Sequence, residues 1–291
     1  MGDRVFYRHY LLLAVPMILQ NAITNLVSFL DNIMVGQLGT EQMSGVAIVN
    51  QLIFVYNLAI FGAVSAASIF GAQYFGNGDH RGHMHSFRFK LYATLLVSGL
   101  TMLLLLTKGS DLISLYLTDT AGNGATDVAL QYGKQYLVIM LVGLVPFAVN
   151  QAYATNIKET GQTLVPMLAS FVAVGTNAVL DYLLIFGVGP FPELGVTGAA
   201  LATVIARYVE AVIVVFWAHR NREKNRYLEG AYRGFGIPVS ELKTILIKGL
   251  PLMFNEVLWA AGMTTVTQCY SVRGLDVVAG LNIATTITNL F

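Results

Sequence analysis

Charged residues are scarce in this sequence, at 11% of its 291 residues. A soluble domain normally carries about 25%, so the chain lacks the polar groups that would cover a water-facing surface. The net charge is only +1, and no bulk electrostatic argument points to nucleic acid or to an acidic partner. One cysteine, Cys269, excludes an internal disulfide framework. It lies in an apolar stretch, where we expect a small buried hydrophobe.

Long apolar runs take the place of the missing charge, since 55% of the residues are hydrophobic. A membrane-spanning helix needs roughly 20 mainly apolar residues. Seven runs are long enough, and an eighth starts near Val277. The seven are Tyr10–Val35, Ser44–Tyr74, Phe89–Thr107, Val128–Tyr153, Thr163–Gly187, Val196–Trp217 and Thr244–Val272. They do not alternate as barrel strands would. The sequence therefore predicts an all-α polytopic membrane protein.

The distribution of Lys and Arg predicts the orientation in the membrane. The first run follows Arg4 and Arg8, but it continues too far and lacks the cleavage site of a signal peptide, so we expect it to remain as a first spanning helix. If the N-terminus is cytoplasmic, the external loops hold only Lys108, Lys134 and Arg273. Nearly all other basic residues then lie in cytoplasmic segments. The pattern predicts a multi-pass protein with a cytoplasmic N-terminus.

The segment between the sixth and seventh runs is the longest polar stretch and reads as a linker. Shifting the sequence by 235 residues brings Pro16 onto Pro251 and Gly39 onto Gly274, with no gap over about 40 residues. Six helices would form one repeat, and an even number gives both repeats the same orientation. We predict a six-helix N-terminal lobe over residues 1–219, a cytoplasmic linker over 220–243, and the start of a second, parallel lobe over 244–291.

Ionisable residues inside the predicted helices are the main candidates for function, because each costs at least about 2.5–3.5 kcal/mol at a helix centre. The five are Asp31, Asp181, Arg207, Glu210 and Glu256. Arg207 and Glu210 are opposite in charge and share a helical face, which favours an internal ion pair. Glu256 follows Pro251 in the seventh helix. It is a candidate for a second site, for binding a cationic substrate, or for an interhelical hydrogen bond.

Asp31 and Asp181 have no such neighbour on their own helices. Both helices run outward, and at roughly 1.5 Å per residue both carboxylates lie at similar depth, a turn or two below the external surface. Asn177 precedes Asp181 by four residues and shares its face. Two carboxylates and an amide would bind a hard cation such as Na⁺, or hold a proton. The alternative is that each aspartate caps a helix or is solvated at its mouth.

No soluble-enzyme motif is present: we find no phosphate loop, no HExxH, no GxSxG and no CxxC pair. The chain is not expected to be an enzyme or to bind a cofactor. His80, His83 and His85 cluster in a predicted cytoplasmic loop. The cluster favours a solvated, pH-sensitive basic loop over a metal site.

Several runs resemble the signatures of prokaryotic multidrug and toxic compound extrusion (MATE) transporters, over essentially the whole chain. They are Pro16 with Asp31-Asn-Ile-Met-Val-Gly-Gln-Leu-Gly39, Lys158-Glu-Thr-Gly161, Asn177-Ala-Val-Leu-Asp181, Gly198-Ala-Ala-Leu-Ala-Thr203, and Gly249-Leu-Pro251 with Glu256. The resemblance implies twelve helices in two six-helix lobes around a central cavity. This chain would hold one lobe and the beginning of the other, so the remainder of the C-terminal lobe is expected but absent from it.

By the same resemblance, the activity is export of cationic or amphipathic small molecules, driven by inward H⁺ or Na⁺ across a bacterial plasma membrane. Asp31 would take the coupling ion, with Asn177, Asp181 and Thr203 completing the first-lobe site. Glu256 is similar to a seventh-helix acid found in part of the family.

Two other functions are compatible with the fold class. A lipid-linked saccharide flippase of the same broad superfamily would need a cationic cavity for pyrophosphate, and Arg207 is the only arginine within a predicted helix. An intramembrane enzyme would need a nucleophile with its base or a set of metal ligands, and the predicted helices contain neither.

Overall fold

The computed structural model describes residues 4–117, 125–233 and 236–288. Its elements are α1 (Arg4–Gly36), α2 (Thr40–Gly76), α3 (His80–Ser114), α4 (Ala125–Val142), α5 (Leu144–Glu159), α6 (Leu164–Phe186), α7 (Val196–Arg220), η1 (Arg226–Leu228), α8 (Val239–Ser271) and α9 (Leu275–Thr288). No strand occurs in these ranges. Four of the helices, α2, α3, α6 and α7, are long and apolar enough to cross a membrane, and the pair α4–α5 adds a fifth span. The predicted all-α polytopic membrane protein is confirmed.

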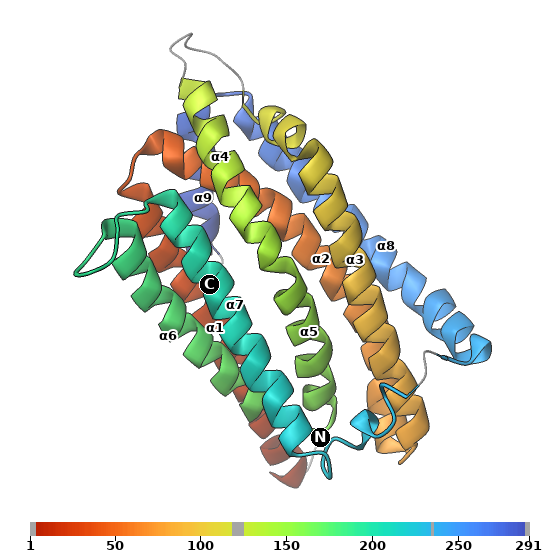
Figure 1. Cartoon of the computed structure of the whole chain (residues 1–291). Coiled ribbons are helices and arrows are strands. Elements are labelled where there is room, and N and C mark those ends of the chain that lie inside the picture. Colours follow the sequence, from red (N-terminus) through yellow and green to blue (C-terminus); the bar gives the residue numbers. More distant parts are fainter. Residues whose placement is uncertain (1–3, 118–124, 234–235, 289–291) are drawn as a thin grey trace.

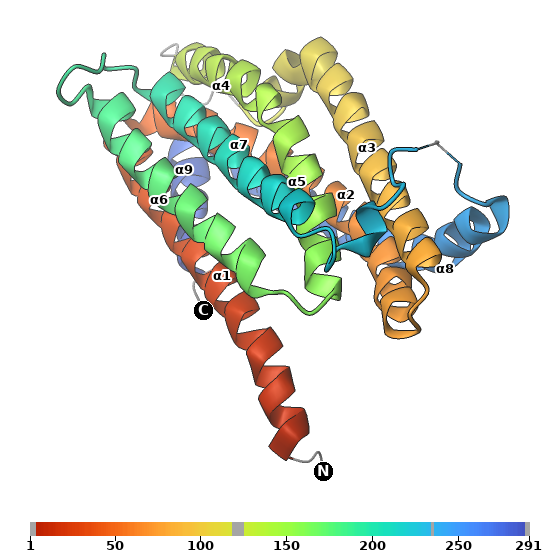
Figure 2. The same ribbon diagram turned by 60° about the horizontal axis from the view of Figure 1, so that its bottom comes forward.

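Helix α2 lies at the centre of the bundle and packs against α3, α4, α5, α8 and α9. Helices α1, α6 and α7 form a group on one side of it, whereas α3 and α8 lie on the other (Figures 1 and 2). The pair α4–α5 runs between α7 and α3 (Figure 2). The largest core cluster fills the space between α2, α4 and α7, with Tyr56, Tyr136 and Ile60 almost fully buried.

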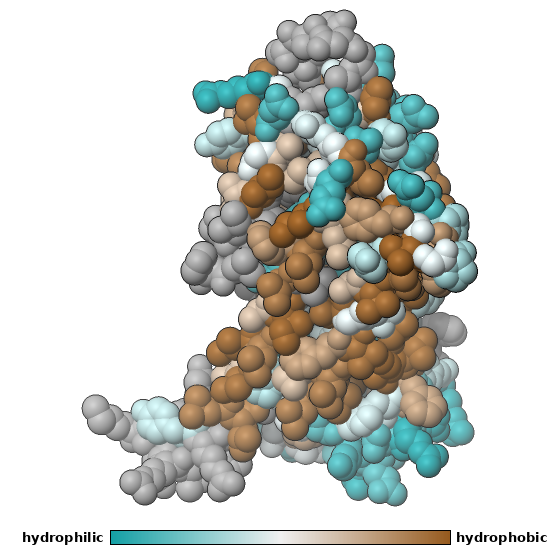
Figure 3. Space-filling view, turned by 90° about the vertical axis from the view of Figure 1, so that its left-hand side faces the viewer, coloured by the Kyte–Doolittle hydropathy of each residue, from teal (hydrophilic) through white to brown (hydrophobic). Residues whose placement is uncertain are grey.

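The outer surface of the bundle suits a lipid environment. Figure 3 shows a broad apolar band over the middle of one face, with hydrophilic side chains gathered toward both ends. Helix α6 contributes a stripe of exposed apolar side chains at helical spacing: Leu164, Leu168, Val172, Val179 and Tyr182. Exposed apolar residues in such a continuous stripe are costly in water, so this face is where we place the hydrocarbon of the bilayer.

The fourth predicted span is not a single helix. The structure breaks Val128–Tyr153 at Gly143, where α4 and α5 meet at a bend of 45°. Pro146 explains the break, because proline has no N–H to bond the carbonyl of Val142 and its ring clashes with that carbonyl. The Val142 carbonyl instead accepts a long hydrogen bond of 3.5 Å from Tyr208 Oη of α7.

The internal repeat predicted from the sequence has a counterpart in the helix bounds. Helix α1 runs from Arg4 to Gly36, and α8 runs from Val239 to Ser271, so both have 33 residues and the same shift of 235 relates their ends. Each contains its proline, Pro16 or Pro251. The turns that follow hold Gly39 and Gly274 at φ of 137° and 114°, a region that side chains rarely adopt. The two helix–turn–helix segments therefore share their local design.

Helix α8 begins at Val239, before the predicted start at Thr244. It lies against α2, where Gly249 faces Ala66 so closely that a Cβ on the glycine would overlap the alanine. Cys269, near the other end of α8, is exposed. The prediction of a buried cysteine was wrong, because an apolar run does not show which face of a helix packs on its neighbours.

Arg88 of α3 binds the segment between α7 and α8 through hydrogen bonds. Its side chain is buried, with 6% exposed, and donates hydrogen bonds to four backbone carbonyls of that segment. The acceptors are the carbonyl oxygens of Gly230 (2.7 Å), Ala231 (2.8 Å), Arg233 (3.3 Å) and Gly236 (2.8 Å). A guanidinium carries five donors in a fixed fork, so one side chain satisfies carbonyls that water would otherwise have to reach. The linker is thus partly packed rather than freely solvated.

Replacing Arg88 with methionine should release this segment. We expect backbone amides around residues 230–233 to exchange with deuterium several-fold faster, because their carbonyls lose a common anchor. Hydrogen–deuterium exchange read by mass spectrometry measures the effect. Arg81→Met is the matched control, since Arg81 is exposed on the same helix. Equal exchange in both variants would show that Arg88 does not hold the segment.

Candidate ion and substrate site

A cavity of about 470 Å³ opens between helices α1, α2, α4 and α7 on one side and the α8–α9 pair on the other. Helices α1, α2, α4 and α7 provide its polar lining, which is Asp31, Asn32, Asn50, Gln51, Asn57, Tyr136, Thr203 and Arg207. The α8–α9 side is mainly apolar, with Trp259, Met263, Val266 and Leu281. The site is therefore a pocket with one polar wall and one apolar wall, and its volume is in the usual range for small-molecule sites.

Asp31 and Asp181 form the acidic part of the site. Asp31 is partly buried in α1 and lines the cavity, while Asp181 in α6 is only 1% exposed. The two carboxylates are close enough to interact electrostatically, and both also interact with Tyr136. Neither caps a helix, since both lie within helices, and Asp181 is not solvated. The alternative of caps or solvated mouth residues is therefore excluded for Asp181.

Each carboxylate keeps a buried oxygen free. No described residue donates a hydrogen bond to Asp31 Oδ1 or to Asp181 Oδ1, and Asn177 Nδ2 likewise lacks an acceptor. Buried oxygens that lack donors favour a proton or a bound cation, because an unpartnered buried charge is costly. The donor set fits H⁺ or Na⁺, the two coupling ions expected from the sequence. Among the described residues, no three His, Cys, Asp or Glu side chains are placed to hold a metal ion together.

The other predicted site residues fall in different places. Thr203 of α7 lines the same cavity as Asp31. Asn177 is buried, with 8% exposed, one turn before Asp181 on α6. Glu256 belongs to α8, but its side chain lies outside what the structure describes. The predicted set is thus spread over α1, α6 and α7, which the fold brings side by side.

Arg207 and Glu210 do not form the ion pair predicted from their spacing. Among the described residues, no carboxylate lies within 4.0 Å of the Arg207 guanidinium. Glu210 instead accepts a hydrogen bond of 2.5 Å from Ser170 of α6, which in turn accepts one of 2.6 Å from Gln20 of α1. Arg207 points the other way, into the cavity, with its Cζ 5.1 Å from the centre of the Phe147 ring. Glu210 therefore bonds a residue of the neighbouring helix α6 rather than pairing with Arg207 on its own helix.

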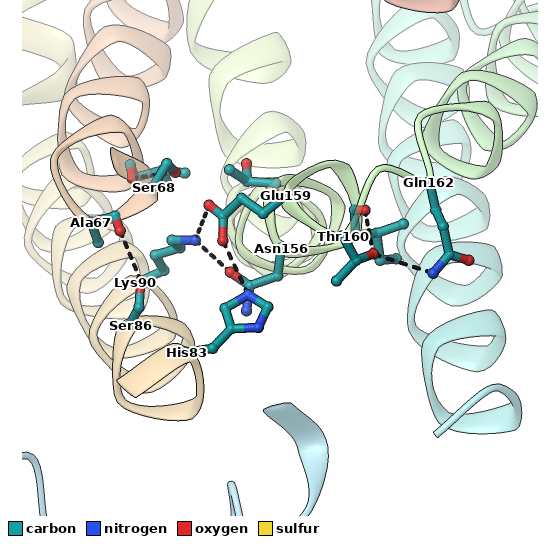
Figure 4. A network of polar contacts seen from close by, with 12 residues as sticks. Ala67, Ser68, His83, Ser86, Lys90, Asn156, Glu159, Thr160 and Gln162 are labelled. Atoms are coloured by element: carbon teal, nitrogen blue, oxygen red, sulfur yellow. Dashed lines mark hydrogen bonds and ion pairs between the residues drawn. The ribbon is translucent and has the colours of Figure 1, made fainter. Parts of the chain in front are cut away.

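A second buried polar cluster lies where α3 begins and α5 ends (Figure 4). Lys90 is completely buried and donates hydrogen bonds to the Glu159 carboxylate and to Asn156 Oδ1. His83 Nε2 lies 3.3 Å from the other Glu159 oxygen. Gly71 of α2 makes room for this carboxylate, because a Cβ there would overlap it. The ion pair joins α3 to α5, and α2 packs against it at Gly71.

The histidine cluster is not the solvated loop that we predicted. Helix α3 begins at His80 rather than near Phe89, and the Asp79 side chain caps it by accepting hydrogen bonds from the backbone N–H groups of Arg81 and Gly82. His83 is 2% exposed and faces Glu159. His85 bonds Glu241 of α8 at 2.8 Å. His83 and His85 face protein, whereas His80 at the start of the helix is exposed.

A signal in the sequence could have found this cluster. His83, Ser86, Lys90, Thr94 and Ser98 recur every three or four residues and are all buried, which is the pattern of one helix face. A polar stripe at helical spacing that continues into an apolar run indicates a helix with a buried polar face. We had assigned its first members to a loop and so missed Lys90 and its partner Glu159.

Comparisons with known proteins agree with this architecture. The family model described as MatE matches residues 16–183. A probable multidrug resistance protein NorM of Thermotoga maritima is 26% identical over 96% of this chain and 58% of its own length. One of Rhizobium meliloti is 30% identical over 76% of this chain and 46% of its own. The chain therefore spans about half the length of these relatives.

Solved structures share the fold. An inward-facing MATE transporter of the MOP superfamily superposes with a TM-score of 0.75 at 24% identity, covering 96% of this chain and 61% of that one. An outward-facing MATE transporter gives a TM-score of 0.75 at 21% identity, covering 97% and 64%. At these identities the likeness shows the fold alone.

Proposed function

The chain belongs to the MatE family, and we propose that it supplies the ion-binding lobe of a transporter that exports cationic or amphipathic small molecules in exchange for H⁺ or Na⁺. The observation that carries the proposal is the pair Asp31 and Asp181: each has a buried carboxylate oxygen with no donor among the described residues, and Asp31 lines the cavity. Carboxylates in structural ion pairs would have partners for these oxygens. Because the described residues provide no such partner, we assign the two oxygens to the binding of a mobile ion.

The division into lobes follows from the same proposal. Residues 1–219 form the first lobe, 220–243 the linker, and 244–291 the opening of a second lobe that repeats the first. The membrane is the plasma membrane of a bacterium, and the N-terminus lies in the cytoplasm. The excess of Lys and Arg in the linker and at the start of α3 supports this orientation.

Ion binding changes the balance between two conformations. With both carboxylates charged, Asp31 and Asp181 repel each other, and separation of α1 from α6 lowers their energy. A proton or Na⁺ removes that repulsion and favours close packing of the two helices, which have extensive contact here. Coupling requires only that the ion bind the two conformations with different affinity. Asn177 and Thr203 complete the oxygen ligands of the ion, and no covalent step is involved.

Replacing Asp31 with asparagine tests the proposal. The protein, expressed from its full reading frame in ethidium-sensitive cells, should raise the tolerated ethidium concentration several-fold. The Asp31→Asn variant should return it to the value of the empty vector at unchanged expression, because the amide can neither hold a proton nor neutralise a cation. Asp127→Asn, an exposed carboxylate at the start of α4, is the control. Full resistance with Asp31→Asn would contradict the assignment.

The competing functions have less support in the site. A lipid-linked pyrophosphate would require several cations, whereas Arg207 is the single cationic side chain in the described lining of the cavity. Binding of lipid pyrophosphate but not ethidium would favour the flippase. Turnover of a membrane substrate that survives Asp31→Asn would favour an enzyme.

A further inference from the structure

A polar bridge of three side chains, Gln20, Ser170 and Glu210, crosses α1, α6 and α7. Gln20 Nε2 of α1 donates a hydrogen bond of 2.6 Å to Ser170 Oγ of α6, and Ser170 Oγ donates one of 2.5 Å to the Glu210 carboxylate of α7. Ser170 is buried, with 6% exposed. None of the three belongs to the described lining of the cavity, so contact with a substrate does not explain the polar bridge.

The carboxylate of Glu210 sets the direction of these hydrogen bonds. Arg207 on its own helix and Lys158 near the end of α5 attract it electrostatically. An ionised carboxylate is an acceptor only, so the single hydroxyl hydrogen of Ser170 points to Glu210. The Ser170 oxygen keeps lone pairs that accept a hydrogen from the Gln20 amide. The polar bridge therefore bonds α1 to α6 and α6 to α7 in one defined arrangement.

The polar bridge repeats the spacing of the ion site on the same helices. Gln20 precedes Asp31 by eleven residues on α1, and Ser170 precedes Asp181 by eleven residues on α6. Eleven residues make almost three full turns, or about 16 Å, so each pair shares one face of its helix. Helices α1 and α6 run side by side in the same direction (Figures 1 and 2). The bond between Gln20 and Ser170 thus joins the two helix faces that carry the carboxylates.

Helix α7 follows the same pattern. Glu210 comes seven residues after Thr203, which is close to two turns, so these two side chains also share a face. The predicted ion ligands lie on α1, α6 and α7, and the polar bridge connects all three helices at a second level.

Apolar packing alone defines the position of α1 poorly. Helix α1 packs chiefly on α6, and many of its apolar side chains are exposed, among them Leu12, Ile18 and Leu26. Lipid is as apolar as these side chains, so hydrogen bonds between helices contribute much of the preference for one register. A slip of one residue along α6 would displace Asp31 by about 1.5 Å relative to Asp181.

We propose that Glu210 is a positioning residue for the ion site: through Ser170 and Gln20 it fixes α1 against α6 and thereby sets the separation of Asp31 and Asp181. The inference rests on the proposed function, and it assigns a role to a carboxylate that the ion site does not use. Without the polar bridge the two aspartates move apart. They then share a cation or a proton less well, so a higher ion concentration is needed to fill the site.

Two variants that change no charge test this role. Gln20→Leu removes the donor, and Ser170→Ala breaks both bonds. The protein, expressed from its full reading frame and reconstituted in proteoliposomes, is assayed for ethidium transport against pH and against Na⁺ concentration. We expect the half-maximal ion concentration to rise about three- to ten-fold in both variants, the range for loss of a hydrogen bond between membrane helices. Glu210→Gln keeps an acceptor for Ser170 and should keep the value of the parent.

Thr176→Val on α6 is the control, because the Thr176 hydroxyl bonds a carbonyl of its own helix, and it should behave as the parent. Parental values in Gln20→Leu and Ser170→Ala overturn the positioning role. A shift in Glu210→Gln alone also overturns it, since Glu210 would then act by its charge. In both cases the proposed transporter stands if Asp31→Asn abolishes transport.

A distance measurement tests the same geometry without transport. Leu30→Cys and Val179→Cys place nitroxide labels at exposed positions of α1 and α6, close to the two aspartates, in a background where the exposed Cys269 is replaced by serine. Double electron–electron resonance gives the distribution of distances between the labels. We expect this distribution to broaden toward longer distances in Gln20→Leu and to stay as in the parent in Thr176→Val. A parental distribution in Gln20→Leu overturns the inference, whatever the transport assays show.

Discussion

Replacing Glu159 with alanine is expected to lower the midpoint of thermal unfolding by on the order of 10 °C. The change leaves Lys90 as a fully buried ammonium without its counter-ion, and removing one partner of a buried pair typically costs about 3–5 kcal/mol. His83 loses its acceptor at the same time. The unfolding of the detergent-solubilised chain is followed by intrinsic tryptophan fluorescence, or by a dye that does not react with thiols.

Two further variants identify the cause. Glu223→Ala removes an equal charge from the exposed linker and should leave the midpoint within about 1 °C, as for most surface changes. The double variant Lys90→Met with Glu159→Leu removes both charges together and should recover most of the loss, because an apolar pair of similar volume needs no counter-ion. If Glu159→Ala melts with the parent, the cluster at the start of α3 contributes no stability.

Replacing Gly198 with leucine is expected to lower the free energy of unfolding by on the order of 3 kcal/mol or more and to abolish ligand binding in the cavity. A Cβ at Gly198 would lie 2.6 Å from the carbonyl oxygen of Leu184 and 3.1 Å from the nitrogen of Ile185, and backbone atoms cannot move aside as a flexible side chain can. Helix α7 must therefore shift away from α6. Thr203 and Arg207 are carried by the same helix, so the cavity changes shape with them.

The measurement compares stability with ligand binding in matched variants. Gly175→Leu on α6 is the control, since a Cβ there meets nothing within 4 Å. We expect the control to keep both its unfolding midpoint and its affinity for ethidium. Gly198→Ala should already weaken both properties, to a smaller extent than leucine. If Gly198→Ala is as stable as the parent, the backbones of α6 and α7 are not packed as closely as the structure indicates.

The sequence predicted the features that depend on local pattern. Length and hydropathy of the runs predicted the spans that the structure shows as α2, α3, α6, α7 and the α4–α5 pair. The shift that pairs Pro16 with Pro251 also relates the ends of α1 and α8. Small residues run from Gly195 to Ala202, and Gly198 among them allows the close packing of α7 on α6. Such features need only the chemistry of neighbouring residues along the chain.

Features that depend on which helices become neighbours were not accessible in the same way. An apolar run shows that a segment can span, but not that Pro146 in its second half divides it, because proline is also tolerated in the first turn of a helix. The spacing of Arg207 and Glu210 permitted an ion pair, yet Ser170 of α6 takes the carboxylate. The buried pairing of His83 and Lys90 was missed because their partner Glu159 is distant in sequence.

The break between α4 and α5 has a consequence for how this lobe moves. A kinked helix often flexes at the kink, but here the backbone carbonyls of three successive residues are held from outside: Val142 by Tyr208, Gly143 by Arg207, and Leu144 by Tyr56 at 2.8 Å. Bending would break these bonds, of which the one from Tyr56 to the Leu144 carbonyl is buried. The bend between α4 and α5 is therefore stabilised from α2 and α7, and we expect these four helices to move as one rigid unit. A ligand that displaces Arg207 would also displace the bend.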